Sequence, residues 1–247
     1  MRRVSEDAQS RVRAQRQMAG CARLCRVLNV HVSVIGRYLP DEGRLIVSNH
    51  FGILDSLILA SVLPVSFVAK EEMREWPFLG WIARSYGVLF VDRERRTTVS
   101  QFAAEVRSRI AGGVDVLVFP EGTTSPDLSV LPFKTGVFEA ISQKAEHSVL
   151  PVYISVEEIN GERALGSVRQ RIVWSDPNLS FLRHCWDIAG LRKIKVEVRI
   201  GEPIPVGDRD RKELAQVSRN SVEQLRDGVV PRDEPWSLSG EPANAPV

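Results

Sequence analysis

A histidine and an aspartate five residues apart form the clearest catalytic pattern in the sequence. The apolar run 45–47 leads through Asn49 to His50, and Asp55 follows after Gly52. Within one continuous helix a five-residue step would turn the two side chains about 140° apart. We therefore expect a strand–loop–helix junction, in which Gly52 permits a tight path and Asp55 accepts a hydrogen bond from one ring nitrogen of His50.

In that arrangement the second ring nitrogen of His50 is free to act as a general base. The pattern supplies a base and the residue that orients it, but no serine, so the nucleophile would come from the substrate. The simpler alternative is a histidine that only caps or packs at the start of a helix.

Three further apolar runs end in polar residues suited to binding a ligand. They lead into Lys70, into Arg93 and into the turn Glu121-Gly122-Thr123. Ligands bind at the carboxyl ends of strands in α/β sheets, and the planar fork of arginine matches phosphate oxygens. The small-residue turn can offer backbone N–H groups to an anion. We expect these segments and His50 to line one crevice, whereas the charged residues 94–96 read as a solvated run.

Alternating strand and helix patterns predict the framework that would position these residues, an α/β domain with a mostly parallel sheet flanked by helices. Strands are expected at 30–34, 45–47, 66–69, 88–91, 114–119, 149–156, 170–174 and 195–200. Helices are expected at 11–28, 54–62, 76–86, 97–111, 136–146 and 209–228.

Composition favours an ordinary globular protein without a bound metal. Of 247 residues, 43% are apolar and 26% charged, and the formal net charge of +2 implies no nucleic-acid partner. Cys21, Cys25 and Cys185 lack the spacing of zinc ligands and read as free thiols. No apolar stretch is long enough to span a bilayer, and no secretory signal is recognisable. We therefore expect a cytoplasmic protein that at most lies on a membrane.

The amino-terminal segment is basic, with eight arginines and two acidic residues in residues 1–37. Helical spacing places Met18, Cys21, Cys25 and Leu28 on one face. Such a helix could lie in the interface of an anionic membrane, or it could be an ordinary helix packed on the domain. The segment after residue 231 has the composition of a disordered tail.

Together these segments resemble the glycerolipid acyltransferase family typified by 1-acylglycerol-3-phosphate acyltransferase (PlsC-like). Asn49-His50 with Asp55 is similar to the first family motif, and residues 90–93 are similar to the second. Residues 119–123 and 149–152 resemble the third and fourth motifs. The resemblance divides the chain into an N-terminal basic amphipathic helix at 1–29, an acyltransferase domain at 30–230 and a tail at 231–247.

The resemblance implies transfer of a fatty acyl group from acyl-CoA or acyl carrier protein to 1-acylglycerol-3-phosphate, giving phosphatidic acid for phospholipid biosynthesis. It makes His50 the general base and Asp55 its orienter, with no metal and no further cofactor. Substrate-binding roles fall to Asn49, Lys70, Arg93, Glu121, Gly122, Thr123 and Pro151. Arg93 would bind the acceptor phosphate and Pro151 would lie near the acyl chain. The implied partners are the lysophospholipid acceptor, the thioester donor and a membrane surface on which the protein is peripheral.

Phe51-Gly52 departs from the family pattern, because polar residues are frequent there, and this could alter the fit of the acceptor. Three alternatives stay open. The acceptor could be another lysophospholipid or a lyso-aminolipid. The protein could be a non-catalytic membrane-surface module, although both His50 and Asp55 are present. The dyad could also activate water in a hydrolase, although no second carboxylate or metal-ligand cluster stands near His50 in the sequence.

Overall fold

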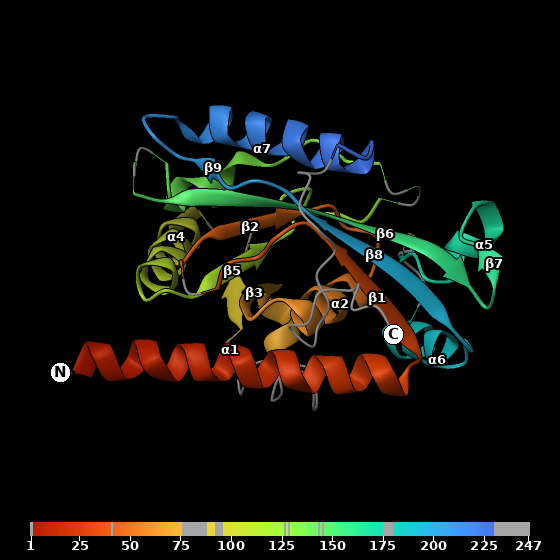
Figure 1. Cartoon of the computed structure of the whole chain (residues 1–247). Coiled ribbons are helices and arrows are strands. Elements are labelled where there is room, and N and C mark those ends of the chain that lie inside the picture. Colours follow the sequence, from red (N-terminus) through yellow and green to blue (C-terminus); the bar gives the residue numbers. More distant parts are fainter. Residues whose placement is uncertain are drawn as a thin grey trace, which may run out of the picture.

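A single mixed sheet forms the centre of the molecule (Figure 1). The computed structural model describes residues 2–40, 42–75, 88–91, 96–125, 127, 129–142, 144, 146–174 and 180–229. Within these ranges the strands are β1 (Val30–Ile35), β2 (Leu45–Ser48), β3 (Val65–Lys70), β4 (Leu89–Val91), β5 (Asp115–Val118), β6 (Ser148–Ile159), β7 (Glu162–Arg163), β8 (Ile194–Ile200) and β9 (Ile204–Pro205).

The strand order β1-β8-β6-β2-β5-β3-β4 confirms the predicted mostly parallel α/β sheet. Strand β2 pairs in parallel with β5 and β6, and β3 pairs in parallel with β5 and β4. The exceptions among the described pairs are the antiparallel partners of β6, which are β7, β8 and β9.

Helices cover both faces of the sheet (Figure 1). On one face, α1 (Arg2–Val27) packs against α2 (Leu54–Val62), and their apolar residues join one core cluster with the sheet. On the other face, α4 (Arg96–Ala111), the 3-10 helix η2 (Thr135–Ala140) and α7 (Arg211–Arg226) enclose a second cluster. Shorter helices complete the described part of the chain: η1 (Glu71–Glu75), α5 (Gly166–Gln170) and α6 (Phe181–Ala189).

The amino-terminal helix α1 packs on the domain along the face that the sequence marks as apolar. Cys25 is buried, Leu28 contacts the core beside α2, and Gln17 is 2% exposed. The arginines at 13, 16, 23 and 26 are exposed. The structure therefore shows the packed arrangement of the two that the sequence left open, and it removes this apolar face from a membrane surface.

Two sequence predictions are corrected. Residues 170–174 are not a strand, because Gln170 ends α5 and the Trp174 N–H donates to the Phe51 carbonyl (3.0 Å) rather than to a strand. In place of the helix expected at 136–146 the structure has the short 3-10 helix η2. Its end is marked by a three-residue hydrogen bond from the Ile141 N–H to the Phe138 carbonyl (3.1 Å). The helix expected at 76–86 and the tail after 231 lie outside the described residues.

Candidate active site

Four neighbouring parallel strands end at one edge of the sheet, as the polar strand ends in the sequence predict. The order β2-β5-β3-β4 places them side by side, and Val47 pairs with Val118 while Lys70 pairs with Val91. The segments that follow β2 and β5 therefore meet, because the carboxyl ends of parallel strands share an edge. Arg93 comes two residues after β4 in the sequence and lies outside the described residues.

His50 and Asp55 form the expected hydrogen bond across the junction between β2 and α2. The distance from His50 Nδ1 to Asp55 Oδ2 is 2.6 Å. The same carboxylate oxygen accepts the backbone N–H groups of Phe51 (2.7 Å) and Gly52 (3.1 Å). Asp55 is fully buried in the first turn of α2, where the helix dipole favours an anion.

The remaining ring nitrogen of His50 is the atom suited to accept a proton. Nδ1 is engaged by Asp55, which selects the tautomer with the hydrogen on Nδ1 and leaves Nε2 with its lone pair. The ring stacks on Phe119, with centroids 4.2 Å apart and planes 14° apart. The side chain keeps 23% exposure while Asp55 has none, so a substrate hydroxyl can approach His50 but not its partner.

Gly52 is required by the close approach of another loop. A Cβ at this position would lie 2.8 Å from the backbone carbonyl oxygen of Ile172. The Phe51 carbonyl accepts the N–H of Trp174, and the Trp174 carbonyl accepts the Thr124 hydroxyl. Phe51 and Gly52, which depart from the family pattern, therefore contact the loop that contains Ile172 and Trp174.

Asn49 anchors the loop between β2 and α2 to β6. We call this loop, residues 49–53, the catalytic loop. Its side-chain amide donates to the Ile154 carbonyl (3.0 Å) and accepts the Ile154 N–H (2.9 Å), and the residue is fully buried. Both polar groups are thereby used by the backbone of a neighbouring strand. Asn49 therefore holds the backbone next to His50 against β6, and the substrate contact that the resemblance implies stays a prediction.

Glu121 is buried, with 3% exposure, beside the backbone of His50. Its side chain accepts the Leu131 N–H at 3.2 Å, while the second carboxylate oxygen has no hydrogen-bond partner. Burial raises the pKa of Glu121 to about 8, against the opposing effect of the backbone N–H groups of Leu131 and His50. Below that pH the carboxyl group of Glu121 is neutral. It lies next to the backbone of His50, the candidate base.

The turn after Glu121 presents the groups that can meet a substrate. Gly122 adopts a positive φ of 71°, and a Cβ there would lie 2.6 Å from Lys134 Nζ. Thr123 is exposed beside it. Lys134 therefore brings a cationic group to this turn, a contribution that the sequence spacing does not reveal.

The loop that follows is tied to His50 through Ser125. The Ser125 N–H donates to the His50 carbonyl (2.7 Å), and its hydroxyl donates to Asp127 (2.8 Å) and contacts Ser129 (3.0 Å). Ser125 thus acts on the backbone of His50 and not on its ring. Sequence reasoning missed Ser125 and Trp174, because their partners lie far along the chain.

Pro151 and Lys70 lie in the sheet itself. Pro151 is a buried residue of β6 that pairs with Val47 and accepts the Gly201 N–H (2.9 Å). Lys70 is the last residue of β3. Lys70 thus ends a strand at the same edge as His50, whereas Pro151 is three residues before Ile154 and deeper in the sheet.

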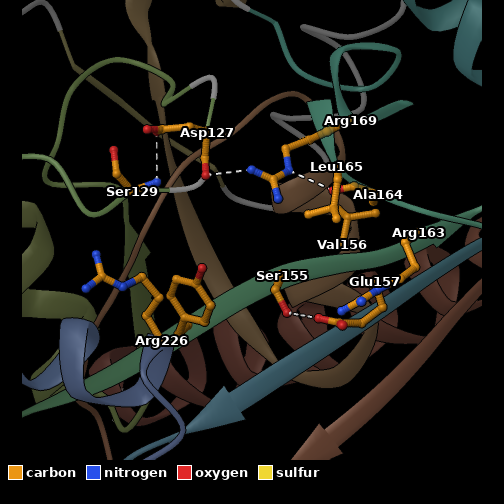
Figure 2. A pocket seen from close by; sticks show the side chains of 11 residues that line it. Asp127, Ser129, Ser155, Val156, Glu157, Arg163, Ala164, Leu165, Arg169 and Arg226 are labelled. Carbon is orange, nitrogen blue, oxygen red and sulfur yellow. Dashed lines mark hydrogen bonds between the residues drawn. The ribbon is translucent and has the colours of Figure 1, made fainter. Parts of the chain in front are cut away.

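A cavity of about 280 Å³ lies on the α7 side of β6 (Figure 2). Tyr153, Ser155 and Arg226 line it, and Arg169 donates to the Asp127 and Ala164 carbonyls in its wall. His50 instead stacks on Phe119, which packs with the α1–α2 core on the opposite face. The cavity is therefore separate from the dyad. Arg169 in its wall stabilises the loop that contains Ser125 through the bond to the Asp127 carbonyl.

No group of three or more His, Cys, Asp or Glu side chains in the described part of the chain could hold a metal ion. None of the helices described here combines the length and the apolar character needed to cross a bilayer.

Comparison with known proteins identifies the family. Residues 31–155 match the protein-family model described as Acyltransferase, a range that runs from the second residue of β1 into β6 and contains both His50 and Asp55. The lyso-ornithine lipid O-acyltransferase of Brucella abortus is 34% identical over 209 residues, which cover 82% of this chain and 78% of that protein. The chain belongs to the PlsC-like acyltransferase family.

One further relative and one solved structure are also similar to this chain. The 1-acyl-sn-glycerol-3-phosphate acyltransferase of Neisseria gonorrhoeae is 29% identical over 81% of this chain and 74% of its own length. The fold matches the crystal structure of the acyltransferase PlsC from Thermotoga maritima with a TM-score of 0.56. That match covers 89% of this chain and 79% of that one at 24% identity, so it bears on the fold alone.

Removal of the base tests the dyad directly. His50→Ala should lower acyl transfer about 100- to 10,000-fold, since a positioned general base contributes about that much. Asp55→Asn should lower kcat as well, because it no longer selects the tautomer. Transfer is measured with purified protein and labelled thioester, and His31→Ala, an exposed histidine of β1, is the control. A His50→Ala protein that keeps more than about a tenth of the activity would remove His50 from the chemistry.

The buried Glu121 predicts a pH dependence of stability. Its pKa is raised to about 8 in the folded protein from an ordinary value near 4.5. Its neutral form therefore stabilises the fold fully below about pH 4.5, and this contribution is lost as the pH rises through 8. Urea unfolding should show wild type losing stability relative to Glu121→Gln between these values, by up to about 1.4 kcal/mol per pH unit.

The exposed Glu162 of β7 supplies the control for this measurement, because Glu162→Gln should leave the slope unchanged. Parallel stability curves for wild type and Glu121→Gln across this pH range would show that Glu121 titrates at its ordinary value.

Proposed function

We propose that this protein transfers a fatty acyl group from a thioester donor to the free hydroxyl of a lysolipid, with a lyso-ornithine lipid as its preferred acceptor. The observation that supports the chemistry is the 2.6 Å bond from His50 Nδ1 to the buried Asp55, beside a ring that is still 23% exposed. This arrangement provides an oriented base with access for a substrate hydroxyl.

The proposed reaction proceeds by direct transfer. Nε2 of His50 takes the proton of the acceptor hydroxyl as its oxygen attacks the thioester carbonyl. The tetrahedral intermediate collapses, the carbon–sulfur bond breaks, and the thiolate recovers the proton from the imidazolium. Asp55 stabilises the transient positive charge on the ring through Nδ1–H.

Acyl-CoA and acyl carrier protein both supply the required thioester carbonyl and thiolate leaving group. The negative charge that develops on the carbonyl oxygen needs nearby donors. The turn at Gly122 and Thr123 and the ammonium of Lys134 are the candidates at this edge. We assign them to the oxyanion or to the donor phosphates.

The preference for a lyso-ornithine lipid rests on the relatives. Proteins named lyso-ornithine lipid O-acyltransferase from Brucella abortus, Rhodobacter capsulatus and Pseudomonas aeruginosa are each 34% identical to this chain. The proteins of Neisseria named 1-acyl-sn-glycerol-3-phosphate acyltransferase are 29% identical over a similar share of the chain. The phosphate acceptor is therefore the second candidate.

Arg93 is proposed to bind the anionic group of the acceptor. An arginine fork accommodates a carboxylate and a phosphate equally well in its geometry, so this residue fits either acceptor. Discrimination would then come from groups that favour or exclude the ammonium of an amino-acid head group.

An acceptor comparison tests the proposal. Purified protein with labelled acyl-CoA or acyl carrier protein should give a higher kcat/KM with lyso-ornithine lipid than with lysophosphatidate. Arg93→Ala should raise the acceptor KM more than the donor KM, and Arg93→Lys should restore it only in part. A preference for lysophosphatidate would make the phosphate acceptor the substrate, and thioester hydrolysis that ignores both lipids would make the protein a hydrolase.

A further inference from the structure

Helix α6 carries two large apolar side chains that the fold leaves in solvent. Leu182 is 76% exposed and Trp186 is 78% exposed, although both belong to the described, ordered turns of the helix. Their four-residue spacing places them in one row on the outer face. The opposite face is buried through His184 and Ile188. The exposed row is therefore not required for packing of the domain.

The carboxyl end of α1, which lies near α6, exposes two further apolar side chains. Val27 is 81% exposed and Leu24 is 47% exposed at that end. The loop after α6 contacts Asn29, two residues beyond the end of α1, because the Asn29 side chain donates to the Arg192 carbonyl. The Ile194 N–H also donates to the Asn29 carbonyl at 3.1 Å. Figure 1 shows α6 beside this end of α1.

We propose that α6 and the carboxyl end of α1 form the surface by which this protein docks on an anionic lipid bilayer. A tryptophan with neighbouring leucine and valine on an exposed helical face is the composition that enters the interface between lipid headgroups and acyl chains. We call Leu24, Val27, Leu182 and Trp186 the α6 patch.

Charge complementarity identifies an anionic bilayer as the occupant of the α6 patch. Exposed cations lie around it at Arg23, Arg26, Arg192 and Lys193. On α6 itself, Asp187 is paired with Arg183 at 3.0 Å and leaves no net charge. The described surroundings are therefore basic, which favours anionic headgroups and disfavours two basic patches meeting across a dimer.

The buried face of α6 connects this surface to the catalytic loop. His184 Nε2 contacts the Ile172 carbonyl at 3.3 Å, and its ring lies 5.8 Å from that of Trp174. Trp174 in turn donates its N–H to Phe51, the neighbour of His50. A bilayer docked on the α6 patch would thus be held within a short chain of contacts from the dyad. This use of the surface rests on the proposed function, but the docking itself does not.

Vesicle binding tests the α6 patch without turnover. His50→Ala protein is co-sedimented with vesicles of phosphatidylcholine containing phosphatidylglycerol, and with vesicles of phosphatidylcholine alone, at low and high salt. Binding should require the anionic lipid and weaken with salt. Leu182→Ser with Trp186→Ser should lower the partition coefficient about tenfold or more, since two large apolar side chains no longer enter the interface.

The control pair is Leu39→Ser with Val229→Ser, which alters apolar residues that are 42% and 63% exposed outside the α6 patch. It should sediment like the parent protein. Brominated phospholipid should quench tryptophan emission in the parent, and Trp186→Phe should remove that quenching while retaining most of the binding.

Equal sedimentation of the patch variant and the parent would overturn the proposal, as would a patch variant that changes only the oligomeric state. The proposed function fails separately. Wild-type protein that docks through the α6 patch but acylates no lysolipid would leave the surface intact. A patch variant should keep activity on detergent-dispersed acceptor and lose it on vesicle-bound acceptor.

Discussion

A single carboxylate oxygen, Oδ2 of Asp55, gathers three donors where β2 passes into α2. Two of them are backbone N–H groups of the loop and the third is the ring of His50, so the bonds that shape the loop also orient the base. Because Asp55 has no exposure, water cannot replace any of these partners, and the loss of one leaves a buried charge poorly satisfied. The close approach of Ile172 that only Gly52 allows completes this arrangement.

The rest of the site keeps that loop in place from both faces of the sheet. Phe119 lies against the ring on the α2 side, while Glu121 lies behind the backbone on the side of α7. Asn49 fastens the loop to β6, and Ser125 fastens the next loop to His50. Two polar residues of the family motifs, Asn49 and Glu121, are therefore buried against the backbone that carries His50. We propose that the turn at Gly122 and the side chain of Lys134 contact the substrates.

The sequence predicts those parts of the structure that depend on local pattern. Helix α2 has the bounds expected from its apolar spacing, and the four polar strand ends belong to neighbouring strands, as the crevice hypothesis requires. The partner of Asn49 lies 105 residues away, which no local pattern can reveal. Residues 170–174 resemble a strand in the sequence because Ile172 and Val173 are apolar. In the structure both are buried, but they lie in a loop whose Trp174 N–H donates to the Phe51 carbonyl. Helix α6 was missed because its apolar residues are divided between a buried and an exposed face.

In direct transfer His50 activates the acceptor hydroxyl, and no covalent acyl-enzyme intermediate forms. Rapid mixing of enzyme with excess acyl thioester, in the absence and presence of acceptor, followed by intact mass measurement of the quenched protein, examines this most directly. Direct transfer predicts that thiol is released only when acceptor is present and that the mass of the protein never increases by one acyl group. A burst of thiol equal to the enzyme concentration without acceptor, with the matching gain in protein mass, would contradict it.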